Sequence, residues 1–254
     1  MEQTVQAAIE KFKCTDNLST LSEDSIALNS PTFLELLRKM GRIGIIIPHQ
    51  IKYEDLCNAL HFYFIMTTSG DLFDTCKQID QTLSKDDFYE LAAKFCFYSL
   101  YEEHDCQYYI EMKSRVKEFL DNNYTPMGIF FSQCCEALEN NLFYPCVCGL
   151  ISLLEGILGR FLASDKISMH VLFESIKTRI ADNKTEIVAE NILSFIDALT
   201  KKADFLNDAE PVYLNRHWLL HGRSNRDIIK LDCISILCAI DAVIDIIQHS
   251  AGGT

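Results

Sequence analysis

Residues 145–162 read PCVCGLISLLEGILGRFL. Apolar residues recur in this stretch every three or four positions, the spacing that gives a helix one apolar face toward a core. They are Val147, Leu150, Ile151, Leu154, Ile157, Leu158 and Phe161. Ser152, Gly156 and Gly159 form a second stripe, where small side chains would let a neighbouring helix approach closely. The stretch therefore predicts a core helix, with Glu155 either at an inter-helix contact or in solvent.

Helical periodicity continues through most of the chain, and no series of alternating strands with glycine-rich hairpin turns interrupts it. We predict an all-α fold. Helices are expected at 3–12, 31–40, 53–66, 72–83, 85–98 and 107–120, and then at 128–138, 145–162, 184–202 and 228–249. The run from Ile43 to Pro48 is the best candidate for a short extended segment or strand, because its β-branched residues, glycine and following proline disfavour a helix. The last helix is apolar on more than one face, so it should be buried from two sides.

A turn-forming segment, DNNYTP at 121–126, separates the two halves of the chain. It predicts a boundary near residue 124, between an N-terminal helical region (1–124) of unknown function and a C-terminal helical domain (125–254). No internal repeat of fixed period is present, which argues against a helical solenoid.

The chain is acidic, with a formal net charge of −13, so most of its surface should repel nucleic acid. Any RNA site must be local. One window fits, because Arg216, Arg223, Arg226 and Lys230 lie close together with only Asp227 as an acid. The alternative is a solvated cluster of charges without a ligand.

The eleven cysteines lack the repeated Cys-x-x-Cys spacing of structural zinc sites. We interpret them as reduced core residues, which fits the cytoplasm. The start of the chain lacks a signal-peptide pattern and no apolar run is long enough for a membrane span, so a cytoplasmic protein without a membrane partner is expected. No cofactor motif is present, since the glycines at 149, 156 and 159 lie in a helical pattern.

The chemistry is concentrated in NRHWLLHG at 215–222, which combines an arginine, two histidines and the only tryptophan. Arginine matches phosphate oxygens, and histidine moves protons near neutral pH. On a regular helix Arg216 and His221 point roughly 140° apart, whereas His217 and His221 share a face. Arg216 and His221 would converge if Arg216 precedes the helix start, or if two subunits bring their motifs together.

Arg216-x4-His221, followed by Gly222 and a final apolar helix, resembles the Arg-x4-6-His motif of the HEPN superfamily and the C-terminal motif of Abi-like bacterial members. The resemblance covers roughly residues 127–250. It implies a helical bundle, a homodimer and a metal-independent endoribonuclease in abortive infection, other antiviral defence or a toxin system, with a possible regulatory protein or antitoxin. Arg216 would then hold the scissile phosphate and His221 would transfer protons, assisted by His217. Asn215 and Glu155 would orient the site, because Glu155 resembles the acid often found on an earlier HEPN helix.

Three other interpretations of the motif stay open. In the first, Arg216 pairs with a carboxylate such as Glu155, the histidines bond to carbonyls, and Trp218 and Leu219 fill the core. In the second, the module is HEPN-like but only binds a nucleotide or a protein. In the third, His217 and His221 ligate zinc, although no Glu lies between them as in His-Glu-x-x-His and no third ligand is identifiable.

Overall fold

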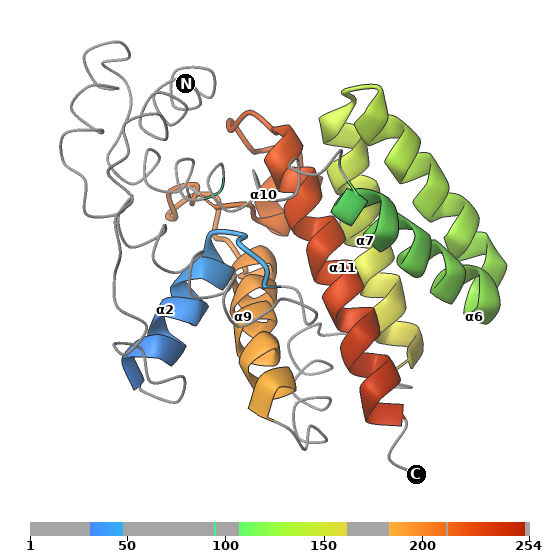
Figure 1. Ribbon diagram of the computed structural model, residues 1–254. Helices are drawn as coiled ribbons and strands as arrows, with labels where there is room; N and C mark the ends of the chain where they lie inside the picture. Colours follow the sequence, from blue (N-terminus) through green and yellow to red (C-terminus); the bar gives the residue numbers. More distant parts are fainter. Residues whose placement is uncertain (1–30, 48–93, 95–106, 162–182, 212, 252–254) are drawn as a thin grey trace, which may run out of the picture. The chain divides into compact units, whose positions relative to one another are not determined.

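The computed structural model describes residues 31–47, 94, 107–161, 183–211 and 213–251 (Figure 1). Within these ranges all regular secondary structure is helical, so the all-α prediction is confirmed for this part of the chain. The helices predicted at 3–12, 53–66, 72–83 and 85–98 lie outside it, apart from Lys94. The chain forms two compact units, and the unit made of Leu34–Gln50 and Tyr109–Thr254 contains nearly every described residue.

The first long element, α6 (Gln107–Glu139), is a helical hairpin rather than one rod. Tyr124 has extended backbone angles (φ −163°, ψ 91°), and Pro126 follows it in the first turn of the second half. A straight helix would separate residues 113 and 139 by roughly 39 Å, yet Lys113 Nζ lies 2.5 Å from Glu139 Oε1. Two helices separated by a turn, as predicted for 107–120 and 128–138, are therefore observed. The domain boundary predicted near residue 124 falls at this kink and stays a prediction.

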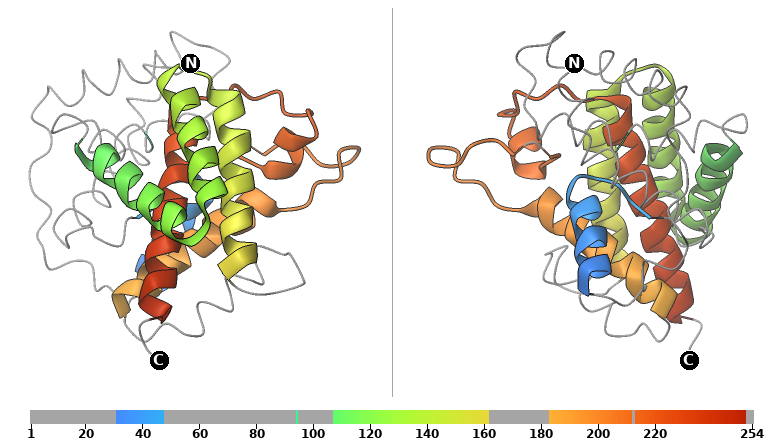
Figure 2. Two further views of the ribbon diagram at one scale, coloured as in Figure 1. Left: turned by 90° about the vertical axis from the view of Figure 1, so that its right-hand side faces the viewer. Right: turned by 60° about the vertical axis from the view of Figure 1, so that its left-hand side comes forward.

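The second half of α6 runs beside α7 (Phe143–Phe161), as Figure 2 shows. A tight turn joins them, in which Asn141 adopts the left-handed conformation (φ 57°) and the Leu142 amide donates to the Ala137 carbonyl at 2.8 Å. A Cβ on Gly149 would lie 2.6 Å from Cys134 Sγ, and one on Gly156 would lie 3.1 Å from Met127 Cε. Close helix approach therefore occurs at these two glycines. At Gly159 a Cβ would meet no atom of the described residues within 4 Å, so the close approach considered there is not observed in this part of the chain.

The core is built around α11 (Lys230–Ala251), which contacts both α7 and α9 (Asn183–Thr200) and lies between them in Figure 1. Every residue from 231 to 240 is buried, and the apolar face predicted for α7 is buried from Val147 to Leu158. Burying each large apolar side chain contributes about 1.5–3 kcal/mol. The two-sided burial predicted for the last helix is confirmed, with α7 and α9 on its two sides.

A short helix, α2 (Pro31–Arg42), is fastened to α9 by one buried amide. Asn191 is fully buried; its Nδ2 donates to the carbonyls of Leu37 (2.9 Å) and Ile45 (3.0 Å), and its Oδ1 accepts from the Ile47 amide at 3.0 Å. Residues 43–47 form a turn and an irregular segment. The strand considered for 43–48 is therefore absent from its described residues, 43–47, whose polar backbone is satisfied partly by Asn191.

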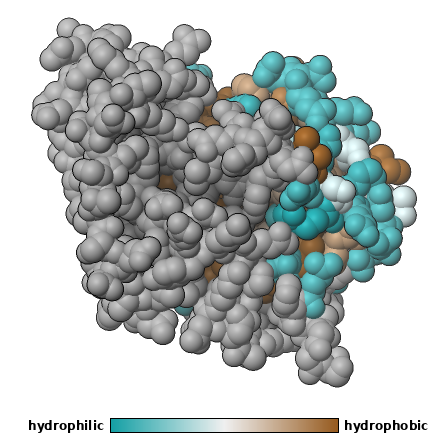
Figure 3. All heavy atoms as spheres, in the orientation of Figure 1, coloured by the Kyte–Doolittle hydropathy of each residue, from teal (hydrophilic) through white to brown (hydrophobic). Residues whose placement is uncertain are grey.

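On the face seen in Figure 3, the coloured surface is mainly hydrophilic with scattered apolar side chains. This fits the acidic composition. Exposed apolar residues on the α6–α7 hairpin are Ile110, Tyr124, Ile129, Phe130, Leu142 and Tyr144.

Candidate functional site

The motif forms a single helical turn, α10 (Arg216–Leu220), and the sequence carries a capping residue at each end of it. Asn215 is the N-cap, and its Oδ1 accepts from the amides of His217 (3.0 Å) and Trp218 (3.3 Å). At the other end Gly222 has φ 64°, its amide donates to Leu219, and the amide of Arg223 donates to Trp218. This is a Schellman ending, which favours glycine at the left-handed position.

A helix of five residues is not stable alone, so contacts to α7 and α9 must hold α10 in place. The Nδ2 of Asn215 donates to the carbonyls of Ala198 and Lys201, both at 3.0 Å, at the end of α9. The Tyr144 hydroxyl from α7 donates to the Leu219 carbonyl at 3.0 Å. Trp218 and Leu219 are buried, as the structural interpretation of the motif expected. The motif is thus a fixed feature of the helical core.

Arg216 is the first residue of α10, and its side chain turns toward α7. Its Nε lies 2.5 Å from Glu155 Oε1, with about a third and a quarter of the two side chains exposed. Nε has no acceptor at hydrogen-bonding geometry among the described residues, so charge rather than an aligned hydrogen bond defines the pair. The pairing of Glu155 with Arg216, expected from the sequence under two interpretations, is present.

The two histidines lie on one face, as their spacing predicted. Their rings stack with centroids 5.9 Å apart and an angle of 24° between planes. Burial lowers the pKa of His217, and the positive charges of Arg216, His221 and Lys202 lower it further, while Glu155 opposes them. Because the pKa of His217 lies below 6.5, this ring is neutral near pH 7.

Two residues near the histidines were missed from the sequence, Phe205 and Lys202. The Phe205 ring lies edge-on to Trp218 (5.1 Å between centroids) and to His221 (5.6 Å). Lys202 is exposed and close enough to affect His217. Both belong to the segment after α9, which no spacing in the motif relates to α10. The Asn215 bonds to Ala198 and Lys201 hold the start of that segment at the site.

The predicted cationic window divides into different environments. Arg226 Nη2 lies 2.7 Å from Asp232 Oδ1, and Asp232 is fully buried and also accepts from the Ile229 amide at the start of α11. Glu210 accepts from Ser224 Oγ at 2.5 Å and from the Asn225 amide at 2.8 Å. Two acids that lie outside the predicted window in the sequence, Asp232 and Glu210, therefore lie beside its residues in the fold.

Arg223 and Lys230 are exposed, whereas Arg226 is half-buried. Arg226 has a structural partner in Asp232, which makes it a poor choice for holding substrate. Arg223 is the residue of the window that extends toward the histidines, since its Cζ lies 5.0 Å from the centroid of the Phe205 ring.

The described cysteines are free thiols, and all but Cys148 are buried. Burial raises the pKa of Cys134 to about 12 and that of Cys135 to about 11, which disfavours the reactive thiolate. Within the described ranges no group of three or more His, Cys, Asp or Glu side chains is arranged to hold a metal. The chemistry of this part of the chain is therefore best sought at α10.

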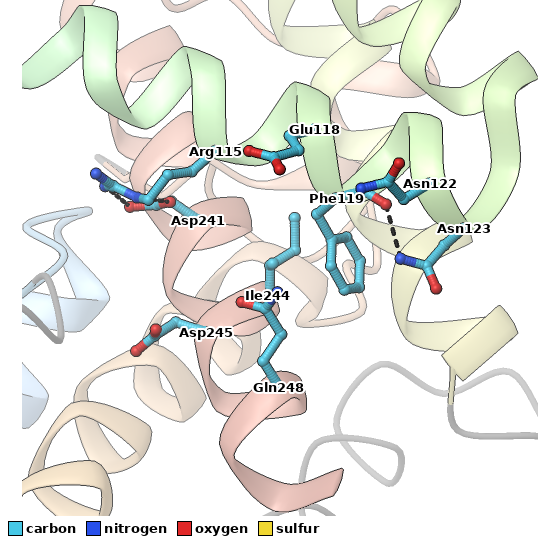
Figure 4. Close-up of a pocket in the computed structure, with 9 residues that line it drawn as sticks. All are labelled: Arg115, Glu118, Phe119, Asn122, Asn123, Asp241, Ile244, Asp245 and Gln248. Atoms are coloured by element: carbon cyan, nitrogen blue, oxygen red, sulfur yellow. Dashed lines mark hydrogen bonds and ion pairs between the residues drawn. The ribbon is translucent and has the colours of Figure 1, made fainter. Parts of the chain in front are cut away.

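A separate pocket of about 270 Å³ lies between α6 and α11 (Figure 4). Arg115 spans its edge, with Nη2 2.8 Å from Asp241 Oδ2. Glu118 and Asp245 add negative charge to the lining, and burial raises the pKa of Asp241. No residue of the motif lines this pocket. Its net negative charge disfavours a phosphate ligand.

By length and composition, α7 is the one described helix that could cross a membrane, with half of the window Phe143–Arg160 buried in the protein. A core helix meets the same criteria. Comparisons with protein-family models, curated proteins and solved structures found no match to this chain.

Proposed function

We propose that the chain is a metal-independent endoribonuclease of HEPN type that cleaves RNA through attack of the 2′-hydroxyl. The observation that carries this proposal is the stacked pair His217 and His221, which adjoins Arg216 and is partly open to solvent. In the proposal, α7, α9, α11 and the second half of α6 make up the HEPN-like four-helix bundle.

Two imidazoles supply the proton transfers that this cleavage needs. We assign His217 as the base, because its lowered pKa keeps the ring in the neutral form that can accept a proton. It accepts the proton of the 2′-hydroxyl as the 2′-oxygen attacks phosphorus. His221 in its protonated form donates to the leaving 5′-oxygen, and the product keeps a 2′,3′-cyclic phosphate. DNA has no 2′-hydroxyl and is not cleaved.

Arg216 stabilises the extra negative charge of the pentacovalent transition state. Glu155 lies beside its Nε, and we assign the remaining guanidinium nitrogens to the phosphate. Asn215 fixes the start of α10 and thereby the position of Arg216. In this scheme Glu155 orients the guanidinium and transfers no proton.

Arg216 and His221 stand at opposite ends of α10. A homodimer in which two motifs face each other would bring Arg216 of one subunit near His221 of the other, and we propose that assembly. We place the protein in the cytoplasm of a bacterium, in phage defence or a toxin system. The N-terminal region would restrain the nuclease, or bind a regulatory protein or antitoxin.

The first experiment is cleavage of a mixed-sequence RNA by the purified chain in EDTA, with DNA of the same sequence alongside. We expect RNA alone to be cut, with loss of about 10²- to 10⁴-fold in rate for His221→Ala. Arg160→Ala, which removes an exposed arginine elsewhere on α7, should cleave normally. RNA cleavage that persists in His221→Ala, or that requires a metal ion, would refute the proposal.

One observation favours a second function, a non-catalytic HEPN-like module that binds a nucleotide or a protein. Arg216 and Asn215 both make contacts within the chain. If Arg216→Ala and His221→Ala both melt much earlier or lose dimerisation, while the wild-type chain cuts no RNA, the binding module is the better assignment.

A further inference from the structure

Three planar side chains lie around the ring of Phe205. Together with Phe205 they form a group that we call the Phe205 cluster: Phe205, Trp218, His221 and Arg223. Trp218 and His221 meet the Phe205 ring at steep angles of 86° and 68°, while the Arg223 guanidinium lies over it at 5.0 Å. Trp218 is buried, whereas His221 and Arg223 are exposed. The cluster therefore has a fixed inner side and an open outer side.

A closed turn positions Phe205. Asp204 Oδ1 accepts from the Leu206 amide at 3.1 Å and its Oδ2 accepts from Asn207 Nδ2 at 2.6 Å. The Asp204 amide in turn donates to Asp208 Oδ2 at 2.7 Å. The bonds from Asn207 and from the Leu206 amide lower the pKa of Asp204.

Exposed cations lie around the cluster although the chain is acidic, beside the exposed carboxylates of Asp204 and Asp208 in the turn. Lys201, Lys202 and Arg223 are exposed there. Of the neighbouring acids, Glu155 is paired with Arg216, while Glu210, Asp204 and Asp208 bond to uncharged groups of the chain. An anionic ligand with a flat apolar part fits this surface better than a simple anion does.

We propose that the Phe205 cluster is a nucleobase subsite, in which the base beside the scissile phosphate of RNA stacks on the Arg223 guanidinium, backed by Phe205. Arginine planes and aromatic rings are the usual stacking partners of unpaired bases. This subsite rests on the proposed function, because it assigns the base next to the phosphate held at Arg216.

Trp218 provides a readout that needs no catalysis. It is the only tryptophan and lies 5.1 Å from Phe205, so its fluorescence reports on the cluster. The full chain is titrated with a 2′-O-methyl oligonucleotide, which cannot undergo 2′-hydroxyl attack, and with an abasic oligomer of equal length and charge. We expect the first ligand to change Trp218 emission and to bind at least about tenfold more tightly than the abasic one.

Arg223→Lys tests the stacking directly, since it keeps the charge and removes the plane. Binding of the base-containing ligand should weaken by roughly tenfold, and binding of the abasic ligand should not change. Arg160→Lys is the matched control, because Arg160 also lies over an aromatic ring, 3.7 Å from the centroid of Tyr124. It should leave both affinities unchanged.

Equal affinity for the two ligands, no binding of either, or full affinity in Arg223→Lys would overturn the subsite. Phe205→Leu provides a second variant that keeps apolar bulk, and it should weaken base-dependent binding as Arg223→Lys does. Base-dependent binding without RNA cleavage would support the subsite and count against the nuclease. RNA cleavage together with equal binding of the base-containing and abasic ligands would support the nuclease and count against the subsite.

Discussion

At the scale of the residue, the surroundings of Arg223 and Arg226 in the fold distinguish two roles that their spacing in the sequence could not. Arg226 and Arg223 lie three positions apart and belong to one cationic window in the sequence. In the fold, Arg226 neutralises the buried Asp232, and Arg223 lies over an aromatic ring at the surface. Of these two arginines, Arg223 is therefore the one suited to a ligand.

Arg226→Ala should destabilise the protein by roughly 3 kcal/mol, because it removes the arginine partner of a buried carboxylate. Arg223→Ala, at an exposed position, should change stability by less than about 0.5 kcal/mol. Chemical denaturation of the two variants beside the wild-type chain measures both. Equal stability of the two would show that the Arg226 pair contributes nothing.

The pH dependence of RNA cleavage should report His217. A base with a lowered pKa stays active as pH falls through 6.5 and is lost only when the pH reaches its own lower pKa. Lys202→Gln removes one of the charges that lower this pKa, so the acidic limb should move to higher pH. The kcat/KM profiles of the two proteins give the comparison, and an unchanged limb would exclude His217 as the base.

At the scale of the element, periodicity was sufficient where a helix has one clear apolar face. It predicted α7, α9 and α11 closely, and the turn formers at 121–126 predicted the reversal inside α6. It did not identify α10 as an element, because five residues are too few to show a period. In the sequence, only the N-cap residue Asn215 and the glycine that follows the helix, Gly222, indicate this one-turn helix.

The candidate site could be predicted only in part from the sequence. The i, i+4 spacing brought His217 and His221 together correctly, and the Glu155 pair was anticipated. Phe205 and Lys202 were not, since they come from a different segment. Asp232 and Glu210 were missed too, because their effect on the cationic window depends on burial and loop closure.

Glycine substitutions test how α2 and α7 pack. Gly41→Ala in α2 would place Cβ 2.1 Å from the Asn191 carbonyl oxygen, a backbone atom of α9 that cannot move easily. It should cost several kcal/mol, with α2 displaced from α9. Gly159→Ala in α7 meets nothing within 4 Å and should stabilise the protein by about 0.5–1 kcal/mol. Thermal melts of both should shift in opposite directions, and a stabilised Gly41→Ala would contradict the packing.

At the scale of the whole molecule, a net charge of −13 confines nucleic-acid binding to a small positive area. Arg216, Lys201 and Lys202 are the cations available there for phosphate, since Arg223 is assigned to the base. Three phosphate contacts to single-stranded RNA predict a slope of about −2 for log K against log salt. Titrations at several salt concentrations measure it. A slope several times steeper would show that RNA follows a broader surface.

The Asn191 amide joins segments that are far apart in the chain, since 144 residues separate it from Ile47. At about 5–20 residues per second, a ribosome needs roughly 7 to 30 s to cover that interval. Throughout it, Leu37, Met40 and the run from Ile45 to Ile47 have emerged without the helix that buries them. In the newly made chain, this apolar segment therefore exists for several seconds before Asn191, which bonds to its backbone, has been made.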